Sequence, residues 1–228
     1  MAYGFDPQLA KVSPFHGAFY AVIDSVTKVV AMGGSRKDIY LSFQEYFEKL
    51  GTKDESWGKP LAALLGGLQV QRELGIPAIG GKDSMSGTFM DINVPPALIS
   101  FAITTADASK VISTEFKKKD SQIVLLAAKR DDRYLIEFES YRASMDRIEE
   151  LVSKGKILAA NTIGKGGVFM ALVKMAVGNK IGLTVDEITR AELNAASYGS
   201  MVMEISKKED ADRLFKGVEY KSRRIFGR

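Results

Sequence analysis

The segment at residues 80–84 combines residue types that can bind an anion or a metal ion. It follows a short apolar run, residues 76–79, and reads Gly80-Gly81-Lys82-Asp83-Ser84. Paired glycines let backbone N–H groups approach an anion closely, because no Cβ intervenes. Lysine adds a positive charge for a phosphate, and aspartate with serine can hold a metal ion or a substrate hydroxyl. We expect a buried strand that ends in a ligand-binding loop, as in many α/β proteins. A plain solvated Gly-rich turn has the same composition, so the residue types leave both interpretations open.

Two common nucleotide-binding motifs are excluded at this segment. A Walker A motif would need glycine at position 76 and serine or threonine at position 83, where the chain has Ile76 and Asp83. The segment does not match G-x-G-x-x-G either. A P-loop ATPase and a Rossmann dehydrogenase are therefore disfavoured.

Longer stretches of the sequence resemble one enzyme family. The string at residues 80–86, followed by the stretch at residues 95–102, resembles the second synthetase half of the long single-chain phosphoribosylformylglycinamidine synthases, also called formylglycinamide ribonucleotide amidotransferases. Other stretches agree in order and spacing, at residues 13–18, 29–34, 44–47, 162–167 and 175–182. The resemblance runs from about Tyr3 to Tyr220. It implies an internal fragment of a longer enzyme of de novo purine biosynthesis.

The resemblance implies an ATP-dependent C–N ligase reaction. In that family, formylglycinamide ribonucleotide, ATP and glutamine give formylglycinamidine ribonucleotide, ADP, phosphate and glutamate. The cofactors expected here are ATP and magnesium. By resemblance, Gly80, Gly81 and Lys82 bind ATP, Ser84 and Asp83 bind the substrate, and Asp83 is also the candidate magnesium ligand. No catalytic residue is expected within the fragment.

A second, degenerate nucleotide site is also implied by the resemblance. Some long-form members hold ADP and magnesium with acidic and amide side chains on the first long helix; here the helix positions read Asp24 and Lys28. Lysine competes with magnesium, so Lys28 replaces the ion's charge in this interpretation. The turn Gly164-Lys165-Gly166, at a helix start, can still bind an anion through its N–H groups. A Gly-rich helix entry with a solvated lysine explains the turn equally well.

Several partners and alternatives follow from the same interpretation. The expected partners are the substrate, the missing first synthetase half, the glutaminase domain and, for the fragment alone, a second copy of itself. The lone histidine, His16, is expected to be structural, and the fragment is expected to be inactive alone. Alternative functions are another ATP-dependent relative, of the aminoimidazole ribonucleotide synthase or thiamine-phosphate or selenophosphate kinase type, and a non-catalytic scaffolding half.

Composition excludes several other classes of protein. The 228 residues contain no cysteine, so disulfides, a thiolate nucleophile and cysteine-based metal sites are excluded. No apolar run is long enough to span a membrane, and we expect a cytoplasmic protein. The net charge of +4 equals the charge of the last eight residues, 221–228. No basic stripe elsewhere supports nucleic-acid binding, so we interpret this tail as a chain end.

Hydrophobic patterns predict an α+β (α/β layered) fold in two domains. Helices are expected over residues 14–33, 61–74 and 144–152, with Ser144 as an N-cap, and from about residue 166. Strands are expected over residues 77–79, 97–104, 122–128 and 200–206. The polar stretch at residues 107–121 is the expected linker. Residues 1–112 would form a partial synthase-like N-terminal domain, and residues 120–228 a C-terminal domain of the kind found in aminoimidazole ribonucleotide synthase.

Overall fold

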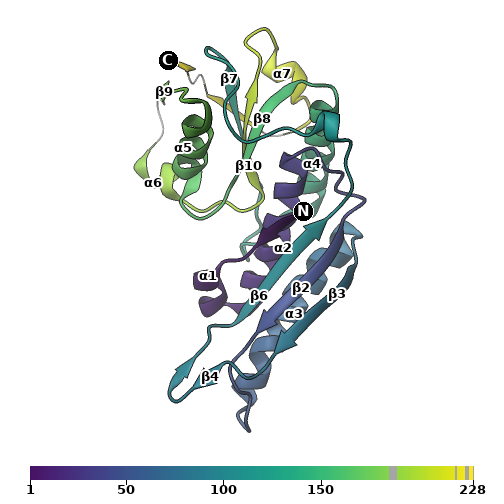
Figure 1. Ribbon diagram of the computed structural model, residues 1–228, viewed down its shortest axis with the longest axis vertical. Helices are drawn as coiled ribbons and strands as arrows, with labels where there is room; N and C mark the ends of the chain where they lie inside the picture. The colour runs from purple at the N-terminus through teal and green to yellow at the C-terminus, as the bar shows by residue number, and fades with distance from the viewer. Residues whose placement is uncertain (185–188, 219, 224–225, 228) are drawn as a thin grey trace. The chain divides into compact units, whose positions relative to one another are not determined.

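The computed structural model describes residues 1–184, 189–218, 220–223 and 226–227 of the chain. The helices are α1 Pro7–Val12, α2 Pro14–Ala31, α3 Asp54–Leu74, α4 Phe138–Ser153, α5 Gly167–Asn179, α6 Arg190–Asn194 and α7 Ala211–Leu214, with a 3₁₀ turn at Ala108–Lys110. The strands are β1 Ala2–Gly4, β2 Tyr40–Tyr46, β3 Ala78–Ser84, β4 Thr88–Phe89, β5 Ile92–Asn93, β6 Ala97–Ile103, β7 Gln122–Leu126, β8 Ile157–Ile163, β9 Leu183–Thr184, β10 Ser200–Ile205, β11 Lys221–Arg223 and β12 Phe226–Gly227. The chain mixes helices with strands, including runs of consecutive strands such as β3 to β6 (Figure 1), which confirms the α+β fold class.

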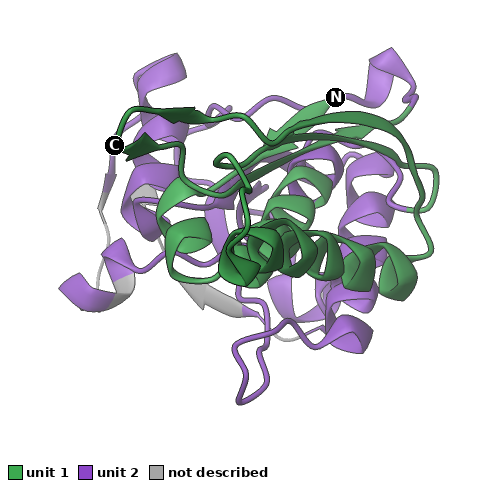
Figure 2. Cartoon of the chain, turned by 90° about the horizontal axis from the view of Figure 1, so that it is seen from below, with its two compact units in different colours: residues 1–26, 37–104 green, residues 27–36, 105–228 purple. Residues whose placement is uncertain are grey.

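By its internal contacts the chain forms two compact units, coloured separately in Figure 2. The first comprises residues 1–26 and 37–104, and the second residues 27–36 and 105–228. The division therefore lies inside α2, whose last residues belong to the second unit. The stretch 107–121, expected as a linker, lies entirely within the second unit.

The first unit is a four-stranded sheet in the order β1-β6-β2-β3 with helices on one face. Strands β2 and β3 are parallel and are joined through α3, whereas β6 is antiparallel to β2 and to β1. Helix α3 packs tightly, because a Cβ at Gly66 would lie 2.2 Å from the Phe15 carbonyl oxygen of α2. The glycine pair in this helix therefore marks a close approach between elements. A Cβ at Gly67 would touch Phe43 of the sheet at 3.5 Å.

Alternation along the strands separates a helix-covered face of this sheet from an open sheet face. Leu41 and Phe43 are buried beneath the helices. The alternate positions of the paired strands form the open sheet face, which is rich in aromatic and apolar side chains: Tyr3, Tyr40, Tyr46, Ile99, Phe101 and Ile103. Tyr3 and Phe101 lie side by side, with ring centroids 6.4 Å apart.

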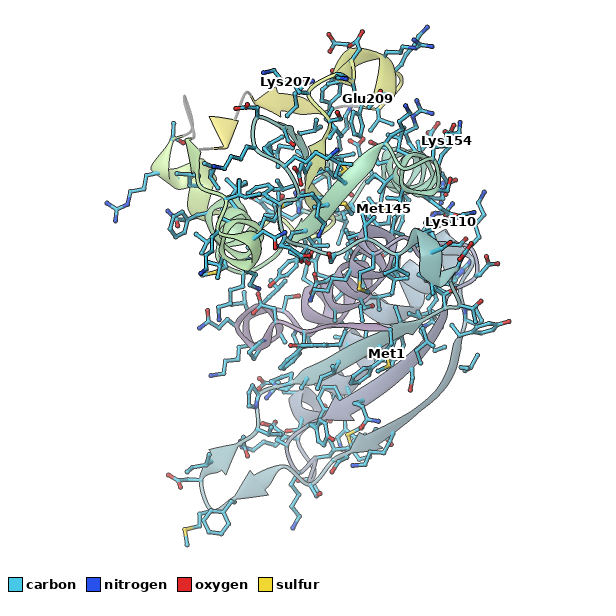
Figure 3. The ribbon with its side chains drawn as sticks, turned by 45° about the horizontal axis from the view of Figure 1, so that its top comes forward. Met1, Lys110, Met145, Lys154, Lys207 and Glu209 are labelled. Carbon is cyan, nitrogen blue, oxygen red and sulfur yellow. The ribbon has the colours of Figure 1, made fainter. Side chains whose placement is uncertain are left out.

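The second unit is built on a sheet in the order β11-β7-β10-β8, with α4 and α5 packed against it. Strand β10 is central and buried at every position, including Glu204. That carboxylate accepts hydrogen bonds from the backbone N–H groups of Lys117 and Lys118 at 2.7 and 3.0 Å. At the unit's surface, Glu209 (Figure 3) accepts a hydrogen bond from Lys156 Nζ at 2.8 Å. The buried carboxyl group of Glu204 is therefore satisfied by backbone donors.

Several long elements lie where the patterns predict them, but strands β2 and β8 were not predicted and two helices begin earlier than expected. Helix α3 begins at Asp54, well before the predicted start at residue 61, and includes Pro60. Helix α4 begins at Phe138, so Ser144 is buried inside the helix and is not its N-cap. Helices α2 and α5 and strands β6, β7 and β10 agree with the predicted segments to within a few residues.

Two further observations concern the ends and the surface. Residues 221–223 of the basic tail form β11 beside β7, while residues 224, 225 and 228 lie outside the described residues. Over the described part of the chain, none of the helices is both long and apolar enough to cross a membrane.

Candidate functional site

The Gly-Gly-Lys-Asp-Ser segment is not a loop after a buried strand. It is the body of β3, the edge strand of the first sheet, and the strand is exposed from Ala78 to Asp83. Only Ile76, before the strand, is buried, at 2 % exposure. The expectation of a buried strand is therefore wrong. An edge strand has a neighbour on one side only, and two glycines leave it without side chains to pack.

Strand geometry sends the candidate side chains to two different faces. In the parallel pairing with β2, Lys82 is partnered with Gln44, Asp83 with Glu45 and Ser84 with Tyr46. Because successive side chains of a strand alternate, Lys82 and Ser84 lie on the open sheet face and Asp83 lies on the opposite face with Glu45. The structure thus brings Lys82 and Ser84 together and separates them from Asp83.

On the open sheet face, Lys82 lies over an aromatic ring. Its Nζ is 5.0 Å from the centroid of the Tyr46 ring. The Tyr46 hydroxyl donates a hydrogen bond to Gln44 Oε1 at 3.4 Å. The hydroxyls of Ser84 and Ser86 are 3.1 Å apart. One positive charge and several hydroxyl and amide groups therefore lie along the sheet edge, a set that suits a phosphate or a sugar hydroxyl.

On the opposite face, two carboxylates occupy neighbouring strand positions. Glu45 is buried, at 6 % exposure, whereas its partner Asp83 is exposed. Burial, and secondarily the negative charge of Asp83, raises the pKa of Glu45 to about 7. Sequence reasoning assigned no role to Glu45. The sequence does indicate that Glu45 is buried, since Leu41, Phe43 and Glu45 are alternate residues of one strand and therefore lie on the same face.

The two glycines of β3 differ in what surrounds them. A Cβ at Gly80 would meet no atom within 4 Å, so the space on its side is open. A Cβ at Gly81 would lie 2.5 Å from the carbonyl oxygen of Phe43 on the neighbouring strand. Strand pairing alone therefore accounts for Gly81. The open space at Gly80 is available to a ligand.

The residues expected to form an auxiliary nucleotide site lie on two elements, the turn before α5 and helix α2. Gly166, with φ 94°, is the N-cap of α5, and Lys165 is exposed beside it. The turn is tight, because a Cβ at the following Gly167 would lie 2.3 Å from the carbonyl oxygen of Leu193. Asp24 is buried and Lys28 is partly buried on α2, in different units. Close packing against the Leu193 carbonyl therefore accounts for the glycine at position 167.

His16 occupies a helix entry, as expected. Its Nδ1 lies 2.8 Å from the Ser13 hydroxyl, and its backbone N–H donates to the same hydroxyl at 3.3 Å. Among the described residues, no group of three or more histidine, cysteine, aspartate or glutamate side chains is placed to hold a metal ion. A magnesium ion at Asp83 would therefore take most of its ligands from water or phosphate.

Comparison with curated proteins gives a consistent set of relatives, although no family model matches the chain. The chain is 25% identical over 213 residues to phosphoribosylformylglycinamidine synthase subunit PurL of Thermoplasma volcanium, a match covering 80% of this chain and 26% of that protein. It is 26% identical over 202 residues to the same subunit of Methanocaldococcus jannaschii, covering 77% and 27%. The chain thus spans about a quarter of the length of these curated relatives.

Solved structures with the same fold include two kinds of protein. T. maritima PurL complexed with ATP superposes with a TM-score of 0.76 at 17% identity, over 99% of this chain and 39% of that chain. E. coli HypE, a hydrogenase maturation protein, gives a TM-score of 0.68 at 14% identity, over 92% and 73%. Sequence and fold together relate the chain to phosphoribosylformylglycinamidine synthase subunit PurL, which confirms the resemblance drawn from the Gly80–Ser86 motif.

Proposed function

We propose that the chain is part of an ATP-dependent phosphoribosylformylglycinamidine synthase and that β3 carries its contribution to the nucleotide and substrate site. The observation that carries the proposal is the exposure of β3. The motif residues from Gly80 to Asp83 are open to solvent on an edge strand, so they are available to a ligand. The curated relatives support the reaction class.

The residues of β3 fit a nucleotide phosphate with a magnesium ion. Lys82 supplies the positive charge, and the open side of Gly80 allows the phosphate to approach the backbone. Asp83 is the candidate magnesium ligand; its side chain lies on the opposite face of the strand from Lys82, so an ion there would take its remaining ligands from water and from phosphate oxygens at the exposed strand edge. When bound, the ion would neutralise charge on the transferred phosphoryl group. T. maritima PurL structures with ATP, AMPPCP and ADP support the choice of nucleotide.

The substrate and partners are proposed on the same basis. A T. maritima PurL structure with FGAR supports formylglycinamide ribonucleotide as the substrate, held by Ser84. A PurLQS complex from the same organism supports association with a glutaminase. The open sheet face is the surface proposed to meet the missing synthetase half, because apolar patches of this kind usually mark an interface. We also propose a degenerate auxiliary nucleotide site at Lys28 and the Gly164–Gly166 turn.

A scaffolding role is the second candidate, and the aromatic open sheet face is the observation that favours it. A titration of the 228-residue chain with an ATP analogue and magnesium separates the two functions. We expect saturable binding if β3 carries a nucleotide site. The scaffold predicts no binding and clear association with the missing half. Mixing the chain with the missing segments should then restore glutamine-dependent ADP release, which neither part gives alone.

Replacing Ser84 with alanine should impair the reconstituted enzyme without unfolding it. Loss of one hydrogen bond to a charged group costs about 1.5–3 kcal/mol, so catalytic efficiency should fall on the order of tenfold to a hundredfold. The partly buried Ser84 side chain faces another hydroxyl, not the core, so the melting temperature should barely change. Ser153→Ala, at an exposed hydroxyl of α4, is the matched control. Unchanged kinetics in the Ser84 variant would remove this residue from the site.

A further inference from the structure

Helix α3 carries large apolar side chains on its solvent side as well as on its packed side. The packed side consists of small and apolar residues that lie buried: Ser56, Pro60, Ala63, Gly66, Gly67, Val70 and Leu74. The solvent side carries what we call the α3 stripe: Trp57, Leu61, Leu64, Leu65 and Leu68. Trp57 and Leu61 are 58% and 59% exposed, and the other three are 46–49% exposed. Soluble proteins rarely expose so many large apolar side chains contiguously unless a partner covers them.

The α3 stripe borders a groove that can receive a large side chain. The groove measures about 560 Å³ and is lined by Phe15, Leu65, Leu68, Gln69, Arg72 and Glu73. It lies along the C-terminal half of the helix, whereas Trp57 lies near the N-terminal end. The indole N–H of Trp57 already donates to the Gly51 carbonyl at 3.1 Å, so this ring is held in place with its polar group satisfied. Such a preorganised aromatic side chain is suited to act as an anchor.

The order of residues along α3 makes the helix complementary to itself in the antiparallel direction. Consider a twofold axis that is perpendicular to the helix, passes through its solvent side and lies level with Ala63 along its length. Such an axis would bring Leu61 opposite Leu65 of the partner. The same axis would bring the acidic Asp54 of the first turn opposite the basic Arg72 of the last turn, with opposite charges meeting at both ends. Asp54, Leu61, Leu65 and Arg72 follow one another at helical spacing, so all lie along one line of the helix surface. Trp57 would face Gln69, which lines the groove.

We propose that α3 is a homodimerisation surface on which a second copy of the chain binds antiparallel, with Trp57 of each copy in the groove of the other. A contact of this kind is isologous, because the same patch serves both copies. The surface is separate from the open sheet face, and this dimer does not depend on the proposed enzymatic function.

Trp57 is the only tryptophan of the chain, so its fluorescence reports the contact directly. Dilution of the unmodified chain should shift the emission to longer wavelength, in step with a dimer-to-monomer transition in sedimentation velocity. Emission and sedimentation that are both independent of concentration and typical of an exposed monomer would overturn the proposal.

Charge-swap variants test the antiparallel register. Asp54→Arg and Arg72→Asp should each raise the dimer dissociation constant at least tenfold, and the double variant should recover most of the loss. Glu55→Arg is the matched control, since Glu55 belongs to the same first turn but lies about 100° round the helix from Asp54. A dimer that survives both single swaps, and that is lost instead on Tyr46→Ser at the open sheet face, would show that the copies meet through the sheet.

Discussion

Replacing Gly81 with valine is expected to lower the free energy of unfolding of the first unit by about 3 kcal/mol. A Cβ at this position would lie 2.5 Å from the Phe43 carbonyl oxygen, and a backbone atom cannot move away as a side chain can. The strand pairing of β3 with β2 would therefore have to shift. Thermal unfolding followed by circular dichroism should show that the melting temperature of the first unit falls by several degrees.

Gly80→Val is the matched control because it makes the same chemical change one residue earlier. No atom lies within 4 Å of a Cβ at Gly80, and valine favours extended backbone, so stability should be unchanged or slightly higher. If β3 binds nucleotide, the valine methyl groups should weaken ATP-analogue binding by filling the open space. Equal destabilisation by both variants would contradict the structural distinction between the two glycines.

The fold was largely predictable from local patterns, and the exceptions have physical causes. Helix α2 and strands β6 and β10 carry strong apolar periodicity, so their existence could be predicted. Helix α3 was predicted too short because Pro60 and Gly58 in its first half are typical helix breakers. Tertiary packing of Pro60, which is buried, outweighs that local preference.

The candidate site was harder to predict, because its layout depends on strand pairing. Residue types at 80–84 indicate a ligand site, but they do not reveal that the segment continues as an edge strand. Once β3 pairs with β2, alternation sends Lys82 and Asp83 to opposite faces. The same pairing brings Glu45, far away in the sequence, beside Asp83. A constellation of this kind is visible only when the register is known.

Glu45→Gln is expected to stabilise the chain in alkaline solution and to have little effect in acid. The carboxyl group has an ordinary pKa of 4.5 and a folded-state pKa of about 7, raised first by burial and then by Asp83. Between these values the folded state binds more protons than the unfolded state, so stability falls as pH rises. The difference in pKa corresponds to about 3 kcal/mol, which the unmodified chain loses between pH 4.5 and pH 8 and the glutamine variant retains.

Equilibrium urea unfolding at several pH values should therefore give stability curves that diverge above pH 5, with the glutamine variant higher. Asp83→Asn should remove only part of the fall, since burial is the larger cause. Glu48→Gln is the control of opposite sign. Hydrogen bonds from Lys59 and Ser56 lower the pKa of Glu48, so its loss should destabilise the chain at neutral pH. A carboxyl carbon resonance of Glu45 that titrates near pH 4.5 would show that the side chain is hydrated, and the two curves should then run parallel.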